Sequence, residues 1–150
     1  MMKTFFAFAI VLSAALLAAC GKDKFETKPL LEIKDYNSKT ITPGETLRIR
    51  LNYFDKEGDL SKGTFTYMRI RTNRIPISNP GANDKADTVI SILPEFPSKN
   101  TAEINIAIDY DFLNEDPVTN DTMYFKFAVV DIKGNKSDTV SSQSIVARQP

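Results

Sequence analysis

The 150-residue sequence contains no histidine and no tryptophan, and its single cysteine is Cys20. Without an imidazole, a serine or cysteine nucleophile has no side chain that takes up and returns its proton near neutral pH. Zinc sites built on histidine are excluded as well, and one cysteine cannot form a disulfide within the chain. The lack of tryptophan argues against a sugar-binding surface built on a broad aromatic face. The chemistry left open is that of carboxylates, in paired-acid hydrolysis or in calcium binding.

An excess of charge of either sign is also lacking, because 19 Lys and Arg balance 19 Asp and Glu. A nucleic-acid partner normally requires a basic surface, so this balance argues against nucleic-acid binding. Several arginines nevertheless fall within one short stretch and could form a local basic face. We interpret them instead as the solvated surface of neighbouring strands: Arg48, Arg50, Arg69, Arg71 and Arg74.

The N-terminal segment has the layout of a signal peptide. An apolar run from Phe5 to Ala19 follows Lys3, and it is shorter than the roughly 20 residues that a transmembrane helix needs. The run leads into Leu17-Ala18-Ala19-Cys20, which resembles the lipobox of bacterial lipoprotein precursors. The resemblance implies that residues 1–19 are cleaved off and that lipid on Cys20 anchors the protein to a membrane. The alternative is an ordinary secreted protein that is cut nearby.

The residues after the cysteine bear on location. Gly21, in place of an aspartate, resembles outer-membrane lipoproteins, and Lys22-Asp23 resembles the export tag of some surface lipoproteins. Residues 20–28 are mostly charged, so we expect a tether that spans at most roughly 30 Å. We therefore expect a protein anchored to the bacterial cell envelope, at the outer membrane, with its domain on the periplasmic or the surface side.

From residue 29 onward, short alternating runs are separated by clusters of Gly, Pro, Asn and Asp, which is typical of an all-β protein. No long helical periodicity appears. We predict one domain, residues 29–150, folded as a single seven-stranded antiparallel β-sandwich. The expected strands are Leu30–Tyr36, Thr46–Phe54, Thr64–Arg71, Thr88–Leu93, Ala102–Tyr110, Met123–Val130 and, as a polar edge strand, Ser137–Val146.

Period-two alternation also predicts which side chains share a face. In the strand at 46–54, the apolar residues at odd positions are expected to point inward. In the strand at 64–71, Met68 and Ile70 share one face and Arg69 and Arg71 share the other, which we expect to be the solvated one.

The segment from Phe125 to Ser137 resembles part of a known family. Its aromatic strand and the following Val130-Asp131-Ile132-Lys133-Gly134-Asn135 are similar to the strand and turn near the end of fibronectin type III and related bacterial immunoglobulin-like domains. The resemblance implies an immunoglobulin-like β-sandwich. The position of the corner tyrosine in those families corresponds to Met123 here, one residue before Tyr124, so this sequence lacks that motif.

The segment Asp55-Lys56-Glu57-Gly58-Asp59, between two expected strands, is a candidate metal site. Calcium prefers several oxygen ligands, and alternating carboxylates on a glycine-kinked loop can converge on one ion. Immunoglobulin-like topology places this loop at the same pole as Asp131, so the candidate ligands are Asp55, Glu57, Asp59 and Asp131. The loop is not an EF-hand, because its glycine occupies the wrong position. The alternative is that Gly58 permits the turn and the acids keep the loop soluble.

A second acidic cluster is expected at the opposite pole. Two of its carboxylates could act as acid and base on a glycosidic bond if burial held one of them protonated. A solvated acidic loop is the simpler interpretation, and we adopt it. The cluster comprises Asp109, Asp111, Glu115, Asp116 and Asp121.

The same topology predicts an orientation. The tether joins the pole of the candidate metal site, so the loops at 75–86 and 111–121 face outward and are the candidate partner surface. We expect a non-enzymatic, lipid-anchored binding or structural module with a protein or glycan partner. The alternatives are a calcium-stabilised adhesive or structural domain and a small carboxylate-dependent glycoside hydrolase.

Overall fold

The computed structural model describes residues 27–74 and 88–150. Nearly all regular structure in these residues is β, and the one helix, α2 (Tyr110–Leu113), has four residues. The expected all-β class is therefore confirmed. The signal peptide, Cys20 and the loop at 75–86 lie outside the described residues. Within the described part of the chain, no helix is both long and apolar enough to cross a membrane.

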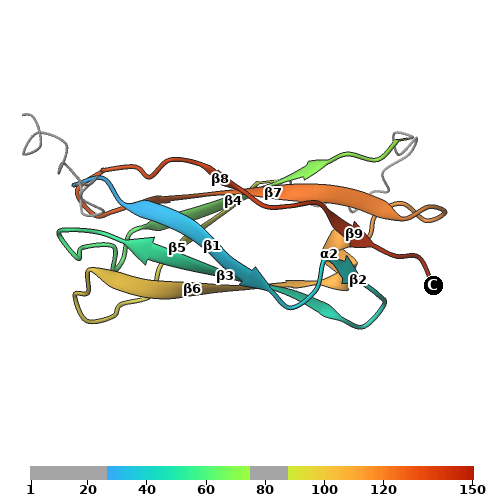
Figure 1. Cartoon of the computed structure of the whole chain (residues 1–150), viewed down its shortest axis with the longest axis horizontal. Helices are drawn as coiled ribbons and strands as arrows, with labels where there is room; N and C mark the ends of the chain where they lie inside the picture. The colour runs from blue at the N-terminus through green and yellow to red at the C-terminus, as the bar shows by residue number, and fades with distance from the viewer. Residues whose placement is uncertain (1–26, 75–87) are drawn as a thin grey trace, which may run out of the picture.

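Three strands form the smaller sheet, in the order β1 (Leu30–Tyr36), β3 (Thr46–Phe54) and β6 (Thr101–Asp109). Both pairings are antiparallel. β3 alternates as expected, because its apolar odd positions are buried while Arg48 and Arg50 are exposed. In Figure 1, β6 forms the border of this sheet, next to β3.

Six strands form the larger sheet. Five of them follow the order β2-β9-β7-β4-β5, and β8 pairs with β7. The pairing of β2 with β9 is parallel, whereas the others are antiparallel. The strands are β2 (Thr40–Ile41), β4 (Thr64–Arg71), β5 (Thr88–Ile92), β7 (Asp121–Val130), β8 (Val140–Ser141) and β9 (Ile145–Ala147).

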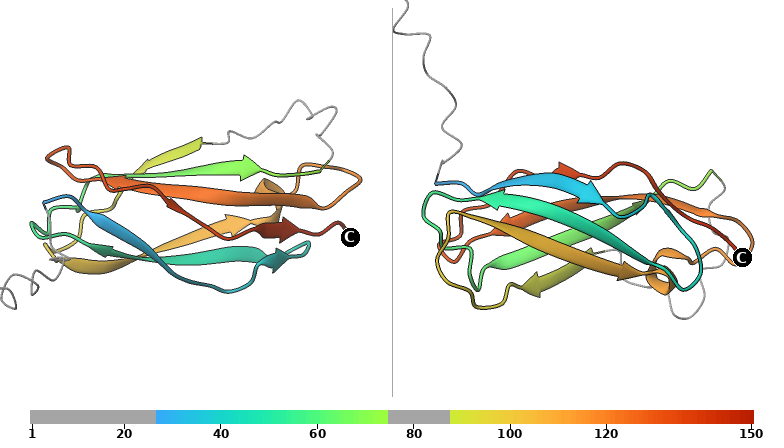
Figure 2. Two further views of the ribbon diagram at one scale, coloured as in Figure 1. Left: turned by 45° about the horizontal axis from the view of Figure 1, so that its top comes forward. Right: turned by 60° about the horizontal axis from the view of Figure 1, so that its bottom comes forward.

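The two sheets pack face to face, as Figure 2 shows, and one apolar core lies between them. Phe125 and Phe127 of β7 are fully buried and stack with their ring centroids 6.2 Å apart. Burial of such a side chain stabilises the fold by about 1.5–3 kcal/mol. The described strands and core residues all lie between residues 30 and 147, so the chain from residue 20 onward contains the whole described fold.

The last expected strand, Ser137–Val146, is interrupted. The hydroxyl oxygens of Ser137 and Ser142 accept hydrogen bonds from the N–H groups of Val129 and Phe125, at 3.0 and 2.8 Å. Side-chain oxygens thus replace backbone carbonyls as acceptors along β7, and only the short strands β8 and β9 remain. Together with the unexpected two-residue strand β2, this makes nine strands in the described residues, where seven were expected.

The expected orientation of β4 is wrong. Arg69 lies between the sheets and is 1% exposed, whereas Met68 on the opposite face is 38% exposed. The guanidinium of Arg69 donates to the backbone carbonyl of Phe112 and to the carboxylate of Glu115, and it lies 4.5 Å from the Phe112 ring. These partners come from the α2 segment, far along the chain. Arg71 is half-buried beside Arg69, so the solvated-surface interpretation holds for Arg48, Arg50 and Arg74 only.

Candidate metal centre

The turn after β3 is wound around the carboxylate of Asp55. Its two oxygens accept hydrogen bonds from the N–H groups of Glu57, at 3.3 Å, and Asp59, at 3.0 Å. Gly58 has a φ of +65°, and a Cβ added to it would lie 2.8 Å from Oγ of Ser98. The glycine is therefore needed both for its left-handed backbone and for the close approach of a neighbouring loop.

The turn after β7 is wound around Asp131 in the same way. One of its carboxylate oxygens accepts from the N–H groups of Lys133, at 2.9 Å, and Asn135, at 2.8 Å. The other accepts from the side-chain amide of Asn135 at 2.8 Å. The two turns are joined where the N–H of Ile132 donates to the carbonyl of Asp59, at 3.4 Å. The expectation that the two turns share one pole is confirmed.

Three carboxylates converge where the turns meet. Asp55, Asp59 and Asp131 each offer an oxygen, and these oxygens lie within 4.8 Å of one another. Asp55 is 0% exposed and Asp131 is 4% exposed. Both carboxylate oxygens of Asp59 are buried, and neither accepts a well-aligned hydrogen bond from the described residues. Burial raises the pKa of Asp55 above its ordinary value, and the neighbouring Asp59 carboxylate adds to the rise against the two N–H donors.

Glu57, the fourth expected ligand, is not part of this group. Its carboxylate accepts a hydrogen bond from the ammonium of Lys133, which also lies 3.2 Å from Oδ2 of Asp59. These carboxylates raise the pKa of Lys133, with Glu57 as the larger cause. The structure thus brings together three of the four expected residues. Sequence reasoning missed Lys133, although its place in the turn after Asp131 is visible in the sequence.

The donor set fits a hard cation. All three groups are carboxylates, and two oxygens bound to one calcium ion, each at about 2.3–2.6 Å, lie at most about 5 Å apart. The oxygen separations meet that limit. Ionisation of three carboxylates at this distance is unfavourable without a counter-charge, because each charge disfavours the next. A bound divalent cation supplies more counter-charge than the exposed ammonium of Lys133.

The acidic cluster at the other pole is used differently. Asp121 is buried and accepts from the side-chain amide of Asn73 and from the N–H groups of Glu115 and Asp116, at 2.9, 2.6 and 2.8 Å. Glu115 forms ion pairs with Arg69 and Arg71. The interpretation of this segment as a solvated loop is therefore wrong for Glu115, Asp116 and Asp121, whereas Asp109 and Asp111 are exposed.

This arrangement does not fit a glycosidase pair. A general acid needs a carboxyl group whose pKa is raised. The hydroxyl of Thr119, followed by the N–H groups of Val118 and Thr119, lowers the pKa of Asp116 instead. Glu115 serves as the counter-ion of Arg69 and Arg71. These carboxylates organise the loop between α2 and β7.

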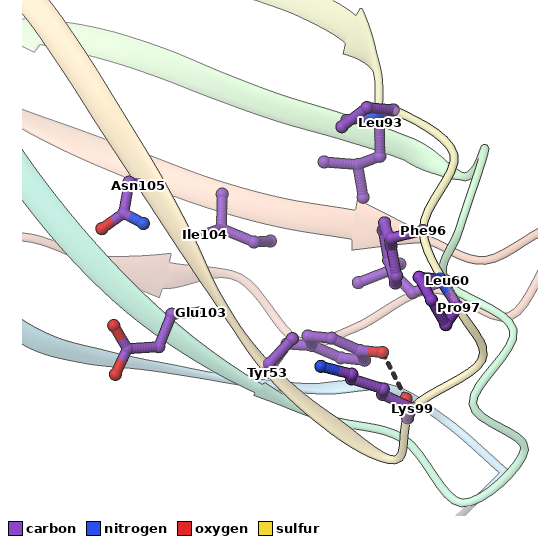
Figure 3. A pocket seen from close by; sticks show the side chains of 11 residues that line it. Tyr53, Leu60, Leu93, Phe96, Pro97, Lys99, Glu103, Ile104 and Asn105 are labelled. Carbon is purple, nitrogen blue, oxygen red and sulfur yellow. Dashed lines mark hydrogen bonds between the residues drawn. The ribbon is translucent and has the colours of Figure 1, made fainter.

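A cavity of about 450 Å³ lies beside β6 and was not foreseen from the sequence. Figure 3 shows its lining, which combines Tyr53 and Ile104 of the smaller sheet with Leu60 and the connection from Leu93 to Lys99. Most of the lining is apolar. Its residues are far apart in the sequence, and only the packing of the two sheets brings them together.

No protein-family model and no curated protein matches the chain. Among solved structures, the sporulation control protein Spo0M of Bacillus subtilis aligns with 8% identity and a TM-score of 0.45, over 82% of this chain and 50% of that chain. This chain thus spans about half the length of that protein. A cohesin module of a Clostridium perfringens family 33 glycoside hydrolase aligns with 12% identity and a TM-score of 0.41, over 83% and 100%. The soluble domain of PmoD from Methylocystis aligns with 12% identity and a TM-score of 0.30, over 79% and 90%. At these values the likenesses carry no information about activity or partners.

Proposed function

We propose that this protein is a lipid-anchored module of the bacterial cell envelope whose immunoglobulin-like β-sandwich binds a protein or glycan partner, or braces a larger surface complex, without enzymatic activity. The lipobox ending at Cys20 and the following Gly21 support an outer-membrane anchor. Strand order supports the immunoglobulin-like type. Without the two-residue strands β2 and β8, the first, second and fifth strands share one sheet, and the third, fourth, sixth and seventh share the other. The fourth strand, β5, pairs with the third, whereas in the constant type it lies in the sheet of the first strand.

The observation that carries this proposal is the end of the domain at which the chain enters the fold. Leu30 pairs with Phe54, directly before the acidic turn, and Lys28 forms an ion pair with Asp138 after the turn at 131–136. The chain therefore enters the fold at the pole of the candidate metal centre, as expected. A short tether holds that pole near the membrane, and the loop between α2 and β7 at the other pole faces a partner.

The anchor is tested by mass spectrometry of the native protein. We expect an N-terminus at Cys20 that carries a thioether-linked diacylglycerol and an acylated amine. A Cys20→Ala variant should keep its leader and lose the lipid mass. An unmodified thiol in the wild-type protein would refute the anchor. Partner binding is tested by pull-down from intact envelopes. Val118→Lys changes an exposed side chain of the loop between α2 and β7, leaves Glu115 and the buried Asp116 in place, and should weaken capture of the partner.

A second candidate function, a calcium-stabilised structural or adhesive domain, is favoured by the convergence of Asp55, Asp59 and Asp131. The three carboxylates would hold the ion. The bound cation would join the turns after β3 and β7 and so stiffen the pole next to the tether.

Isothermal titration calorimetry with calcium tests this candidate on the chain from residue 20 onward with Cys20→Ser. We expect saturable binding together with a rise in melting temperature that EDTA reverses. Asp59→Asn should abolish both effects. Asp111→Asn, at the opposite pole, should change neither. Absence of both heat and a melting shift in the wild-type chain would remove the calcium proposal.

A further inference from the structure

The two sheets differ in width at the side bordered by β6. Among the described strands, β6 pairs only with β3, and its other edge is open. The facing sheet extends to β5 and continues into the segment from Leu93. Part of the inner face of the larger sheet therefore has no strand opposite it.

The register shows which backbone groups lie on the open edge of β6. The N–H of Asp55 donates to the carbonyl of Asn100 at 2.8 Å, and the N–H of Tyr110 donates to the carbonyl of Glu45 at 3.1 Å. Both pairs extend the β3–β6 register, in which Leu51 lies opposite Ile104. In an antiparallel ladder, every second pair of opposite residues is hydrogen-bonded, so a residue of β6 an even number of positions from Asn100 or Tyr110 bonds to β3. Ile104 therefore directs its N–H and C=O toward β3, whereas Glu103, Asn105 and Ala107 direct theirs toward the open edge.

The cavity opens beside this edge. Glu103, Ile104 and Asn105 of β6 contribute to its lining, together with the half-buried Leu93 and Phe96 opposite them. Figure 3 shows Ile104, Leu93 and Phe96 around the apolar space. A strand added next to β6 would lie about 4.8 Å from it and would point every second side chain into this space.

The wall of the cavity is already held in place. The N–H of Phe96 donates to Oγ of Ser61 at 3.0 Å, and Oγ of Ser98 donates to the carbonyl of Gly58 at 2.9 Å. The Tyr53 hydroxyl donates to the carbonyl of Lys99. A preformed wall loses little conformational freedom when a ligand binds.

The charges at the cavity favour an acidic group on the ligand. Glu103 is paired with Lys34 on the outer face of the sheet. Lys99 lines the cavity and is exposed, and it forms no ion pair with another described residue. The ammonium of Lys99 is thus the charge that a ligand in the cavity would meet.

We propose that the open edge of β6 binds an extended peptide segment of a partner protein. The segment adds a fourth strand to the smaller sheet, places an apolar side chain in the cavity and carries an acidic residue that meets Lys99. Main-chain hydrogen bonds to Glu103, Asn105 and Ala107 supply affinity, and the cavity supplies specificity. This inference deepens the proposed binding function by naming the chemistry of the partner and a surface apart from the loop between α2 and β7.

The test uses the chain from residue 20 onward with Cys20→Ser. The probes are capped eight-residue peptides in which Thr alternates with Leu or Phe, each with one Glu near an end. We expect saturable binding with a dissociation constant below about 1 mM. Amide hydrogen exchange at Glu103 and Asn105 should slow in the complex. Peptides N-methylated on the amides that face β6 should bind at least about tenfold more weakly, because methylation removes the donors.

Two protein variants locate the site. Asn105→Pro removes an N–H from the open edge and leaves the ladder with β3 intact, so binding should weaken at least about tenfold. Ala102→Phe fills the cavity from its lining and should weaken binding by a similar factor. The matched control is Ile90→Pro on the open edge of β5. The N–H of Leu93 donates to the carbonyl of Gly63, so the register directs the N–H of Ile90 away from β4.

The proposal is overturned if no peptide binds saturably up to about 1 mM. It is also overturned if the N-methylated peptides bind as well as their parents, or if Ile90→Pro weakens binding while Asn105→Pro and Ala102→Phe do not. Melting curves identify any variant that fails to fold, and the N-methylated peptides then decide with wild-type protein. None of these outcomes affects lipid attachment to Cys20, calcium binding or capture of a partner by the outward loop, which are measured separately.

Discussion

Replacing Glu115 with glutamine removes the carboxylate that two arginines of β4 share. The side chain of Arg69 is 0% exposed and that of Glu115 is 8% exposed, so this ion pair has little access to water. Glutamine keeps the size of the side chain but removes the negative charge that Glu115 presents to the guanidinium of Arg69. The variant therefore measures what the Glu115 carboxylate contributes beside this buried cation.

Breaking a buried ion pair by removing one partner costs about 3–5 kcal/mol. Arg69 retains the carbonyl and the ring of Phe112, so we expect a loss at the lower end, about 3 kcal/mol. A domain of this size has a free energy of unfolding of roughly 6–18 kcal/mol. The loss corresponds to a fall in melting temperature of roughly 10 °C.

Urea unfolding followed by circular dichroism measures this loss. The control is Glu95→Gln, because Glu95 forms an exposed ion pair with Lys62. That change should cost less than about 1 kcal/mol. A Glu115→Gln variant that unfolds within about 1 kcal/mol of the wild type would refute the view that Glu115 compensates a buried charge.

Three further predictions concern the acidic pole. Because burial raises the pKa of Asp55, the folded state holds the proton of this carboxyl group more tightly than the unfolded chain does. In EDTA, melting curves should therefore show that the wild type loses stability relative to Asp55→Asn as the pH rises from about 4 to 7. Added calcium should remove this loss. Lys133→Ala should strengthen calcium binding, measured by calorimetry, by up to about fivefold. The reason is that the exposed ammonium of Lys133 competes with calcium for Asp59, and an exposed ion pair contributes about 0.2–1 kcal/mol. An unchanged affinity would contradict that competition. Gly58→Ala should destabilise the domain by about 1–3 kcal/mol in urea, through its φ and the contact with Ser98. Gly134→Ala, whose added Cβ meets nothing within 4 Å, should cost less, and equal losses would show that the contact is unimportant.

Strand positions could largely be predicted because alternation is a local property. β3 buries its apolar odd positions and exposes Arg48 and Arg50, as its sequence alone indicates. The last strand could not be predicted in the same way. Its interruption depends on Ser137 and Ser142 accepting from N–H groups of β7, 8 and 17 residues away, and alternation within the last strand does not indicate these contacts.

In β4, alternation predicts which side chains share a face but not which face is buried. Its alternation groups Met68 with Ile70 and Arg69 with Arg71, and this grouping is correct. Alternation does not say which of two mixed faces is buried. Glu115 and the Phe112 carbonyl decide that question, because they compensate the guanidinium of Arg69 inside the fold.

The sequence by itself determined the all-β class, most strand positions and the two turns wound around Asp55 and Asp131, because alternation and turn chemistry act over a few residues. Only the tertiary structure decided that Asp59 rather than Glu57 joins these aspartates, and that a cavity opens beside the free edge of β6. These outcomes depend on which side chains from distant strands meet. A charged or apolar side chain interacts with a particular partner only when the packing of the sheets brings the two within a few ångströms of each other.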